Sequence, residues 1–266
     1  MSTSMMAKGV GETGDVSEIC AFVQRTTGIQ LGEQKHIMVR ARLAKRLRAL
    51  GLPSVTAYLD YLKQPANGDE ITQLIDVLTT NKTSFYRESR HFDLLSERLG
   101  LLAERGEEPV IWSAGCSSGE EPYTMSLVAL RARVQARILA TDISTRVLGM
   151  AKAGRYAAEV VADVPKDVQQ RYFTKAGAES EVGPAMREQI SFAPLNLLGE
   201  WRMRGPFHVI FCRNVMIYFD KTTREQLVGR FHEKLAPGGL LFIGLSESLS
   251  GLNHPYRLVE PGVYLR

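Results

Sequence analysis

Apolar residues in the first third of the chain recur at the spacing of an α-helix. With successive residues placed about 100° apart, Val39, Leu43, Leu47 and Leu50 share one arc. Serine, aspartate and glycine residues punctuate this pattern where helices would begin and end. We therefore predict that residues 16–80 are all helical. The predicted helices are Ser17–Arg25, Gln34–Leu50, Ser54–Leu62 and Asp69–Leu78, and Ser17, Ser54 and Asp69 are their expected caps.

From Glu108 onward, apolar runs of strand length alternate with helical patterns. Such alternation predicts a mostly parallel sheet covered on both faces, to which a C-terminal hairpin adds an antiparallel edge. The predicted strands are Pro109–Gly115, Arg137–Ile143, Phe207–Asn214, Gly238–Leu245, Tyr256–Leu258 and Val263–Leu265. The predicted helices are Pro122–Arg133, Ser144–Ala153 and Thr222–Leu235.

The stretch Tyr172–Asn196 interrupts this rhythm with short alternating runs around a turn-forming segment. It predicts a small antiparallel excursion of two or three strands at about 170–195, against the alternative of an irregular surface insertion. The expected layout is a flexible tail (1–15), a helical domain (16–80), a linker that contributes to a ligand site (81–107) and an α/β domain (108–266).

Composition narrows the class of protein. The chain is 44% hydrophobic and 23% charged, as expected of a soluble globular protein. No apolar run approaches the roughly 18–20 residues of a membrane span, and the N-terminus lacks the apolar core of a signal peptide. Cys20, Cys116 and Cys212 have no metal-ligand spacing, so we expect no metal site and a reducing cytoplasm. A net charge of +4 gives no global nucleic-acid signal.

The distribution of charge is more informative than its sum. The helix predicted over Gln34–Leu50 contains basic residues and no acidic one. A solvated face is the usual meaning of a charge run, but the unmixed sign favours a surface for an acidic partner. The basic residues are Lys35, Arg40, Arg42, Lys45, Arg46 and Arg48.

Candidate chemistry gathers where the predicted strands end. Gly115 and Gly119 allow a sharp turn between the first strand and its helix, and they leave room for a ligand. Asp142 ends the second strand about twenty residues later, which is where ribose hydroxyls lie in nucleoside-binding domains. The purely structural alternatives are that the glycines form an ordinary strand–helix turn and that Asp142 is an acid near the N-terminus of the next helix.

The two acids that follow Gly119 argue against a dinucleotide. Glu120 and Glu121 would repel a pyrophosphate at this helix N-terminus, and the loop lacks the G-x-G-x-x-G pattern. An amino-acid-bearing nucleoside with ammonium and sulfonium groups fits better, which points to S-adenosylmethionine (SAM). Asn81, Thr83 and Arg87, in the polar linker upstream, can converge on the same ligand, with Arg87 at its carboxylate or near its transferred methyl group.

Six ordered motifs then resemble one family, the CheR-type chemoreceptor glutamate O-methyltransferases, from about Ser17 to the C-terminus. They are Thr80-Asn-Lys-Thr-Ser-Phe-Tyr-Arg-Glu, Trp112-Ser-Ala-Gly-Cys-Ser-Ser-Gly-Glu-Glu-Pro-Tyr, Ala140-Thr-Asp-Ile, Asn196-Leu-Leu, Phe211-Cys-Arg-Asn-Val-Met-Ile-Tyr-Phe and Ala236-Pro-Gly-Gly. The resemblance implies an α/β, Rossmann-like SAM-dependent methyltransferase sheet, an N-terminal helical domain and an inserted antiparallel β-subdomain.

The resemblance also assigns residues. It implies SAM contacts at Asn81, Thr83, Arg87, Glu121, Asp142, Asn196, Leu197, Asn214 and Val215, with Glu120 open as the alternative to Glu121. It implies that the basic helix, with Arg40, Arg42, Lys45 and Arg46, docks on the acidic methylation helices of chemoreceptors. In enterobacterial members the β-subdomain grips a receptor's C-terminal pentapeptide. Here Gly183-Pro184 interrupts that region, so we do not expect pentapeptide capture.

The implied reaction is methyl transfer from SAM to receptor glutamates, which yields glutamyl methyl esters and S-adenosylhomocysteine. A glutamate is already ionised near pH 7, so no general base is required. Tyr218 is expected to orient the carboxylate and Arg87 to help neutralise it, although Tyr218 can also be a core aromatic. The alternatives are a non-catalytic SAM-binding signalling scaffold, a dinucleotide-dependent oxidoreductase and, more weakly, a nucleic-acid methyltransferase. We expect a cytoplasmic protein that is recruited to receptor arrays without insertion into the membrane.

Overall fold

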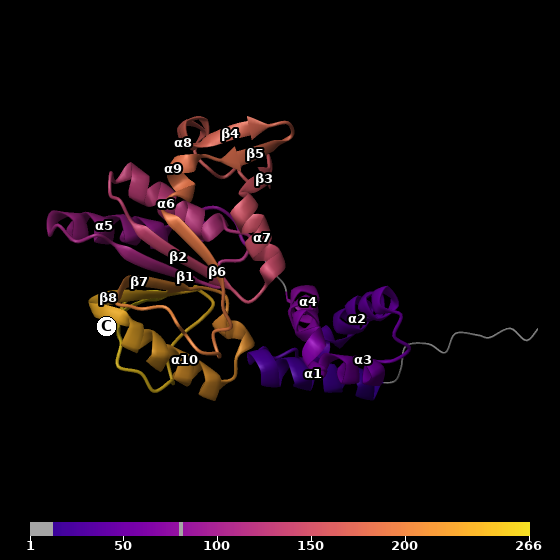
Figure 1. Ribbon diagram of the computed structural model, residues 1–266. Helices are drawn as coiled ribbons and strands as arrows, with labels where there is room; N and C mark the ends of the chain where they lie inside the picture. The colour runs from indigo at the N-terminus through magenta and orange to yellow at the C-terminus, as the bar shows by residue number, and fades with distance from the viewer. Residues whose placement is uncertain (1–12, 80–81) are drawn as a thin grey trace, which may run out of the picture. The chain divides into compact units, whose positions relative to one another are not determined.

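The computed structural model describes residues 13–79 and 82–266, and the chain divides into two compact units between Thr80 and Asn81. Figure 1 shows a helical unit and a larger α/β unit, each of which is described by itself. Residues 1–12 of the predicted tail lie outside the described residues. Residues 13–15 belong to the first helix, so the tail was predicted slightly too long.

Over residues 13–79, the helical unit has four α-helices around one apolar cluster. They are α1 (Thr13–Thr27), α2 (His36–Leu50), α3 (Val55–Leu62) and α4 (Gly68–Leu78), with short 3₁₀ turns η1 (Glu33–Lys35) and η2 (Pro65–Asn67). Ser54 caps α3 as predicted, because its side chain accepts a hydrogen bond from the Ala57 amide at 3.1 Å. The two other predicted caps are wrong. Helix α1 starts before Ser17, and α4 starts at Gly68, so Ser17 and Asp69 lie inside their helices.

Helix α2 buries the predicted apolar arc. Val39, Leu43 and Leu47 are buried and Leu50 packs half-buried against the same cluster. Gly51 ends the helix in a left-handed conformation (φ 67°), which a residue without a Cβ adopts at little cost.

Two of the basic residues of α2 are used inside the helical unit. Arg46 forms a fork-to-fork ion pair with Glu70 of α4, a residue that is 6% exposed. The Tyr58 hydroxyl donates to the same carboxylate at 2.6 Å. Arg42 donates to the Val77 and Thr79 carbonyls at 2.8 and 3.1 Å, beside the C-terminus of α4. These guanidinium groups therefore hold α2 to α4.

The α/β unit is built on a seven-stranded sheet in the order β6-β2-β1-β7-β8-β10-β9. Five strands run parallel and the C-terminal hairpin pairs antiparallel, as predicted. The order reverses direction between β1 and β7, so a crevice is expected at the carboxyl ends of these two strands. The strands are β1 (Val110–Ala114), β2 (Arg137–Asp142), β6 (Ile190–Pro194), β7 (Phe207–Cys212), β8 (Leu235–Ile243), β9 (Arg257–Glu260) and β10 (Val263–Leu265).

Helices cover both faces of this sheet. On one face, apolar residues of α5 (Arg90–Glu104) and α6 (Glu120–Arg131) share a buried cluster with Ile111 and Phe211. On the other, Phe231 of α10 (Lys221–Lys234) contacts the Trp112 ring at 5.3 Å. The alternation of Ile111 and Trp112 along β1 directs them to opposite layers. Figure 1 shows α10 on the side of the sheet opposite α5 and α6.

The region predicted as a linker, 81–107, is not one beyond its first residues. Helix α5 occupies most of it and buries Phe92, Leu95, Leu99 and Leu102. These positions follow the i, i+3, i+4 spacing of an amphipathic helix. The segment is therefore part of the α/β unit and contributes to its core.

The inserted subdomain exists, but it begins earlier than predicted. Its sheet has the order β3-β5-β4, with β3 (Arg155–Ala157), β4 (Phe173–Ala176) and β5 (Glu179–Val182), accompanied by α8 (Lys166–Tyr172) and α9 (Pro184–Arg187). Strand β6, which we assigned to this excursion, instead joins the main sheet beside β2. Helix α7 (Thr145–Ala153), whose N-cap is Ser144, leads into the subdomain.

The argument against peptide capture also changes. Pro184 is the first residue of α9 rather than part of a strand, so it removes no hydrogen bond from the subdomain's ladder. The physical reason that we gave for expecting no pentapeptide capture is therefore wrong, and the expectation itself stays a prediction.

No helix in the described ranges, 13–79 and 82–266, combines the length and apolar content needed to cross a membrane.

The Arg46–Glu70–Tyr58 cluster gives a stability prediction. Glu70→Ala removes the carboxylate that both partners share, so we expect the free energy of unfolding to fall by about 2–3 kcal/mol. The exposed pair Lys63–Asp60 provides a matched control, since Asp60→Ala should cost less than about 0.5 kcal/mol. Denaturant unfolding monitored by circular dichroism measures both, and equal losses in the two variants would contradict this role for the cluster.

Candidate active site

The turn after β1 is shaped by two glycines in left-handed conformations. Gly115 has φ 91°, and a Cβ there would lie 2.5 Å from Cγ2 of Val215. Gly119 has φ 100°, and its Cβ would lie 2.9 Å from Cβ of Ala151. The sequence is therefore constrained to glycine at both positions by close packing as well as by backbone conformation. The first contact also brings Val215, a predicted SAM contact, against the turn.

Asp142, at the end of β2, is tied to this turn by hydrogen bonds. One carboxylate oxygen accepts from the Ser117 amide and the other from the Ser144 amide, each at 2.9 Å. The side chain is 9% exposed. Asp142 therefore fixes the turn at the end of β2, and its carboxylate is of the type that accepts hydrogen bonds from ribose hydroxyls.

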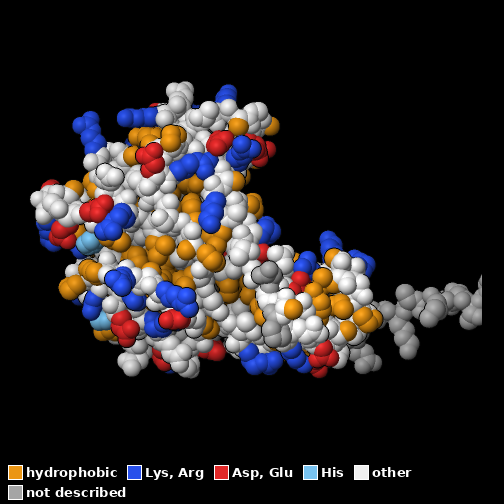
Figure 2. Space-filling model, in the orientation of Figure 1, with side chains coloured by type: hydrophobic (Ala, Val, Ile, Leu, Met, Phe, Trp, Pro, Cys, Tyr) orange, Lys and Arg blue, Asp and Glu red, His pale blue; other side chains and the backbone are white. Residues whose placement is uncertain are grey.

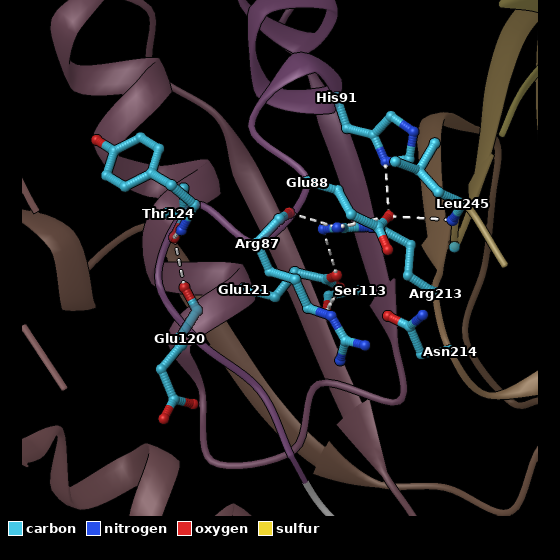
Figure 3. Close-up of polar contacts among 12 residues, drawn as sticks. Arg87, Glu88, His91, Ser113, Glu120, Glu121, Thr124, Arg213, Asn214 and Leu245 are labelled. Carbon is cyan, nitrogen blue, oxygen red and sulfur yellow. Dashed lines mark hydrogen bonds and ion pairs between the residues drawn. The ribbon is translucent and has the colours of Figure 1, made fainter. Parts of the chain in front are cut away.

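A buried arginine, Arg213, joins three segments at the ends of β1 and β7 (Figure 3). Its side chain is 1% exposed. It donates to Glu121 at 3.2 Å, to Glu88 at 2.9 Å and to the Arg87 carbonyl. Ser113 of β1 donates a further hydrogen bond to Glu121 at 2.7 Å. Glu121 is thus held at the carboxyl end of the central strand by two independent donors.

Burial and the charge of Arg213 have opposite effects on the pKa values of the two carboxylates in this network. Burial raises the pKa of the Glu121 carboxyl, and Arg213 and Ser113 oppose that rise. Burial raises the pKa of Glu88 most, but the charge and hydrogen bonds of Arg213, together with the Leu245 amide and His91, outweigh burial and the pKa is lowered. One guanidinium therefore faces two carboxylates, an arrangement suited to a ligand that carries an ammonium group.

The segment before α5 is held in an unusual backbone path. Tyr86 and Glu88 have φ of 52° and 56°, in the left-handed region that costs non-glycine residues free energy. The Tyr86 amide donates to Thr124 at 3.3 Å, and the Arg87 carbonyl accepts from Arg213. The Arg87 guanidinium donates to the Lys82 carbonyl at 2.8 Å. The network thus fixes the backbone on both sides of Arg87.

The two adjacent acids at the start of α6 point to different neighbourhoods (Figure 3). Glu120 accepts from the Ser118 hydroxyl at 3.0 and 2.7 Å, and burial raises its pKa. Glu121 alone contacts Arg213 and Ser113 at the strand ends. The geometry therefore favours Glu121 over Glu120 as the acid that faces a ligand at this edge.

A half-buried carboxylate, Glu247, organises the ends of β7 and β8. It accepts from the Asn214, Gly244 and Ile217 amides at 2.8, 2.6 and 3.1 Å. Asn214 is left-handed (φ 59°), and its side-chain nitrogen would lie 2.4 Å from a Cβ at Gly244. These contacts set the position of Asn214 and of the short turn η3 (Met216–Tyr218).

Asn196 and Leu197 follow β6 at the same edge of the sheet. The Leu195 amide donates to the Asp142 carbonyl at 2.9 Å, which places the segment beside the end of β2. The Asn196 side chain accepts from the Leu198 amide at 2.9 Å in an Asx turn, and Leu197 is buried.

The structure thus gathers most of the predicted ligand residues along one edge. Glu121, Asp142, Asn196, Leu197, Asn214 and Val215 all follow strand ends that are linked by the contacts above. Thr83 and Tyr218 are half-buried in the segments that carry Arg87 and Asn214. Asn81 lies outside the described residues.

The predicted docking residues behave differently from one another. Arg42 and Arg46 contact carbonyls and a carboxylate of their own unit, whereas Lys45 is exposed on α2. Arg48, a basic residue of α2 that was not among the predicted docking residues, is exposed as well. Arg40 is half-buried. Figure 2 shows Lys and Arg side chains at the rim of the helical unit.

Sequence reasoning missed three residues that shape the site. Arg213, Glu88 and Glu247 were not predicted as site residues, although each is a charged residue next to a segment that was. A charged side chain directly after a buried strand is the signal that could have identified Arg213, whereas Glu247 lies four residues beyond the end of β8.

The contact between Gly115 and Val215 gives a double-mutant prediction. Gly115→Ala should destabilise the protein by about 2–4 kcal/mol, since it adds a clash to left-handed strain. Val215→Ala in the same chain removes the clash and should restore part of that loss.

Gly149→Ala, in α7 with open space around the added Cβ, serves as the control and should be neutral or slightly stabilising. Thermal unfolding of the four variants checks the prediction. Strict additivity of the Gly115 and Val215 changes would show that the two residues do not press on each other.

Comparison with known proteins assigns the chain to a family. Residues 81–264 match the family described as "CheR methyltransferase, SAM binding domain", and residues 14–79 match "CheR methyltransferase, all-alpha domain". A protein of Salmonella typhimurium named "Chemotaxis protein methyltransferase" is 40% identical over 92% of this chain and 88% of its own length. Proteins of the same name are 39% identical in Escherichia coli, over 92% and 88%, and 35% identical in Borreliella burgdorferi, over 94% and 93%. The resemblance read from the sequence is therefore confirmed: the chain belongs to the CheR methyltransferase family, and its α/β unit is a SAM-binding methyltransferase domain.

Proposed function

We propose that the protein transfers the methyl group of SAM to glutamate side chains of chemoreceptors, as part of chemotaxis or a related chemosensory pathway. The products are a glutamyl methyl ester and S-adenosylhomocysteine. The relatives that match nearly the whole chain are named chemotaxis methyltransferases, which supports a receptor as the acceptor. The observation that carries the proposal is the buried pair Arg213–Glu121 at the carboxyl end of β1, where a SAM ammonium can be bound.

The cofactor is expected to lie along the strand ends. Glu121 accepts from the ammonium group, Asp142 from the ribose hydroxyls, and Asn196, Leu197, Asn214 and Val215 line the remaining edge. Arg87, with Asn81 and Thr83 in the same segment, is expected to contact the methionine end of the cofactor. In these roles the residues bind and orient SAM, whose sulfonium supplies the reactive methyl group.

The acceptor chemistry needs alignment more than proton transfer. A glutamate carboxylate is ionised near pH 7, so its oxygen is already nucleophilic. Arg87 is expected to neutralise part of its charge and the Tyr218 hydroxyl to orient it, while the site excludes water. In the transfer step the carboxylate oxygen forms a bond to the methyl carbon as the bond from that carbon to sulfur breaks.

A methylation assay tests the proposal. Incubation with radiolabelled SAM and membranes that contain the organism's receptors should place base-labile label on receptor glutamates, identified by mass spectrometry. A SAM-binding scaffold would bind the cofactor and transfer no label. A parallel assay with receptors that lack their C-terminal tails tests the prediction that no pentapeptide is captured, since tail removal should then leave the rate unchanged. In this proposal the protein works in the cytoplasm and is recruited to receptor arrays.

The choice between the two acids gives one prediction. Glu121→Gln removes the charge that would pair with the SAM ammonium, so the Kd for SAM should rise roughly 10- to 100-fold. Glu120→Gln keeps a hydrogen bond with Ser118 and should change the Kd less than about three-fold. Isothermal titration calorimetry measures both values, and a larger effect at Glu120 would reverse the assignment.

The basic helix gives another prediction. Charge reversal of the exposed residues Lys45 and Arg48 should raise the KM for receptor roughly 3- to 10-fold per substitution and leave SAM binding intact. Arg42 and Arg46 are unsuitable for this test because they hold α2 to α4. Arg25→Glu, an exposed reversal on α1, is the control. If all three reversals act alike, α2 has no special part in docking.

A further inference from the structure

The loop that leaves β6 is held from behind by one side chain of α10. This loop, residues 195–206, has no helix or strand and carries Asn196 and Leu197, the proposed cofactor contacts. A loop without regular structure leaves its carbonyl groups to be satisfied by side chains or by water. Here Arg230 supplies the donors, with hydrogen bonds of 2.6 Å to each of the Leu197 and Gly199 carbonyls.

Trp201 completes this contact. Its indole N–H donates to the Leu197 carbonyl at 3.1 Å, so that carbonyl accepts from two side chains. The Arg230 guanidinium lies 3.9 Å from the centroid of the Trp201 ring, within the range of a cation–π interaction. The guanidinium is therefore fixed by its stacking on the ring as well as by the two carbonyls.

The pair is anchored in the core of the α/β unit. The Trp201 ring meets Trp112 of β1 edge to face, with centroids 4.8 Å apart, and lies 5.3 Å from Phe231. Trp112 is fully buried. A continuous series of contacts thus runs from the central strand, through Trp201 and Arg230, to the backbone of Leu197.

Hydrogen bonds within the loop itself also fix its backbone at residues 196–199. The Asn196 side chain accepts from the Leu198 amide, and the Gly199 amide donates to the Asn196 carbonyl at 2.9 Å. Together with the bonds from Arg230, these contacts order the backbone from 196 to 199. Binding sites whose loops are already ordered lose less conformational entropy when the ligand binds.

We propose that Arg230, together with Trp201, is a positioning residue for the cofactor: it holds the 196–199 backbone in the conformation that binds the nucleoside part of SAM. The inference rests on the proposed cofactor contacts at Asn196 and Leu197. It adds a residue on the opposite side of the loop, which acts through Leu197 without touching the ligand. Because the role proposed for Arg230 concerns cofactor binding and not methyl transfer, substitutions of Arg230 should change the affinity for the cofactor.

Arg230→Met is the informative change, because the methionine retains an apolar stem against Trp201 but removes both hydrogen bonds. The Kd for S-adenosylhomocysteine should rise about 10-fold or more, while kcat at saturating SAM changes less than about two-fold. Arg230→Lys keeps a cation that can reach one carbonyl, and it should recover part of the affinity.

Lys234→Met is a matched control. Lys234 lies one turn further along α10 and donates to the Met203 carbonyl at 3.2 Å, so it holds the same loop at a point beyond the cofactor segment. This variant loses a comparable contact, and the Kd should stay within about two-fold of wild type. Trp201→Phe keeps an aromatic face for Arg230 but removes the N–H donor to Leu197 together with part of the ring that packs against Trp112. It should raise the Kd roughly three-fold, which keeps the test decisive if Arg230→Met fails to fold.

Calorimetry with S-adenosylhomocysteine measures these affinities without a methyl acceptor. An unchanged Kd in Arg230→Met and Trp201→Phe, or an equal rise in Lys234→Met, would overturn the proposal. A wild-type protein that binds S-adenosylhomocysteine but methylates no receptor would refute the proposed acceptor and leave this inference standing.

Discussion

The α/β unit depends on the cation of Arg213, which is buried between two carboxylates. Removing a charge from water is costly, and a buried guanidinium is stable only where its donors are used and its charge is balanced. Glu88, Glu121 and the Arg87 carbonyl meet both conditions, and they come from the segment before α5 and from the start of α6. The ion therefore joins segments far apart in the sequence, and the left-handed residues beside Arg87 keep their costly conformations because this network holds them.

A similar principle appears at Glu247 and Asp142. Each carboxylate accepts from backbone amides of two segments rather than from a partner cation alone. Anions that are bonded to main-chain amides fix the path of the backbone, whatever side chains follow. The edge of the sheet is thus built as a rigid frame from which Asn214 and the glycine turn present their groups. A methyltransferase gains from such a frame, because its chemistry depends on the alignment of three atoms.

The parts of the fold that the sequence predicted were those governed by local periodicity and punctuation. The strand–turn–helix unit at Gly115 and the Ser54 cap depend on neighbouring residues, and they could be read directly. Helix α5 was missed because its polar lead-in hid the spacing of Phe92, Leu95 and Leu99. The placement of β6 and the role of Arg213 depend on partners distant in sequence, and no local pattern carries that information. Arg42 and Arg46 were read as part of a surface for a partner because their helix carries basic residues and no acidic one, whereas their guanidinium groups contact α4 and its C-cap.

The cysteines of the site motifs have a consequence for self-reaction. Cys116 lies in the glycine turn and Cys212 ends β7, and both are buried among the residues expected to surround an activated methyl group. A thiolate is a stronger nucleophile than a carboxylate, and an accessible one would take the methyl group itself. Burial raises the pKa of both thiols, which disfavours the thiolate form that would react. The packing that shapes the turn therefore also makes these two cysteines poor nucleophiles.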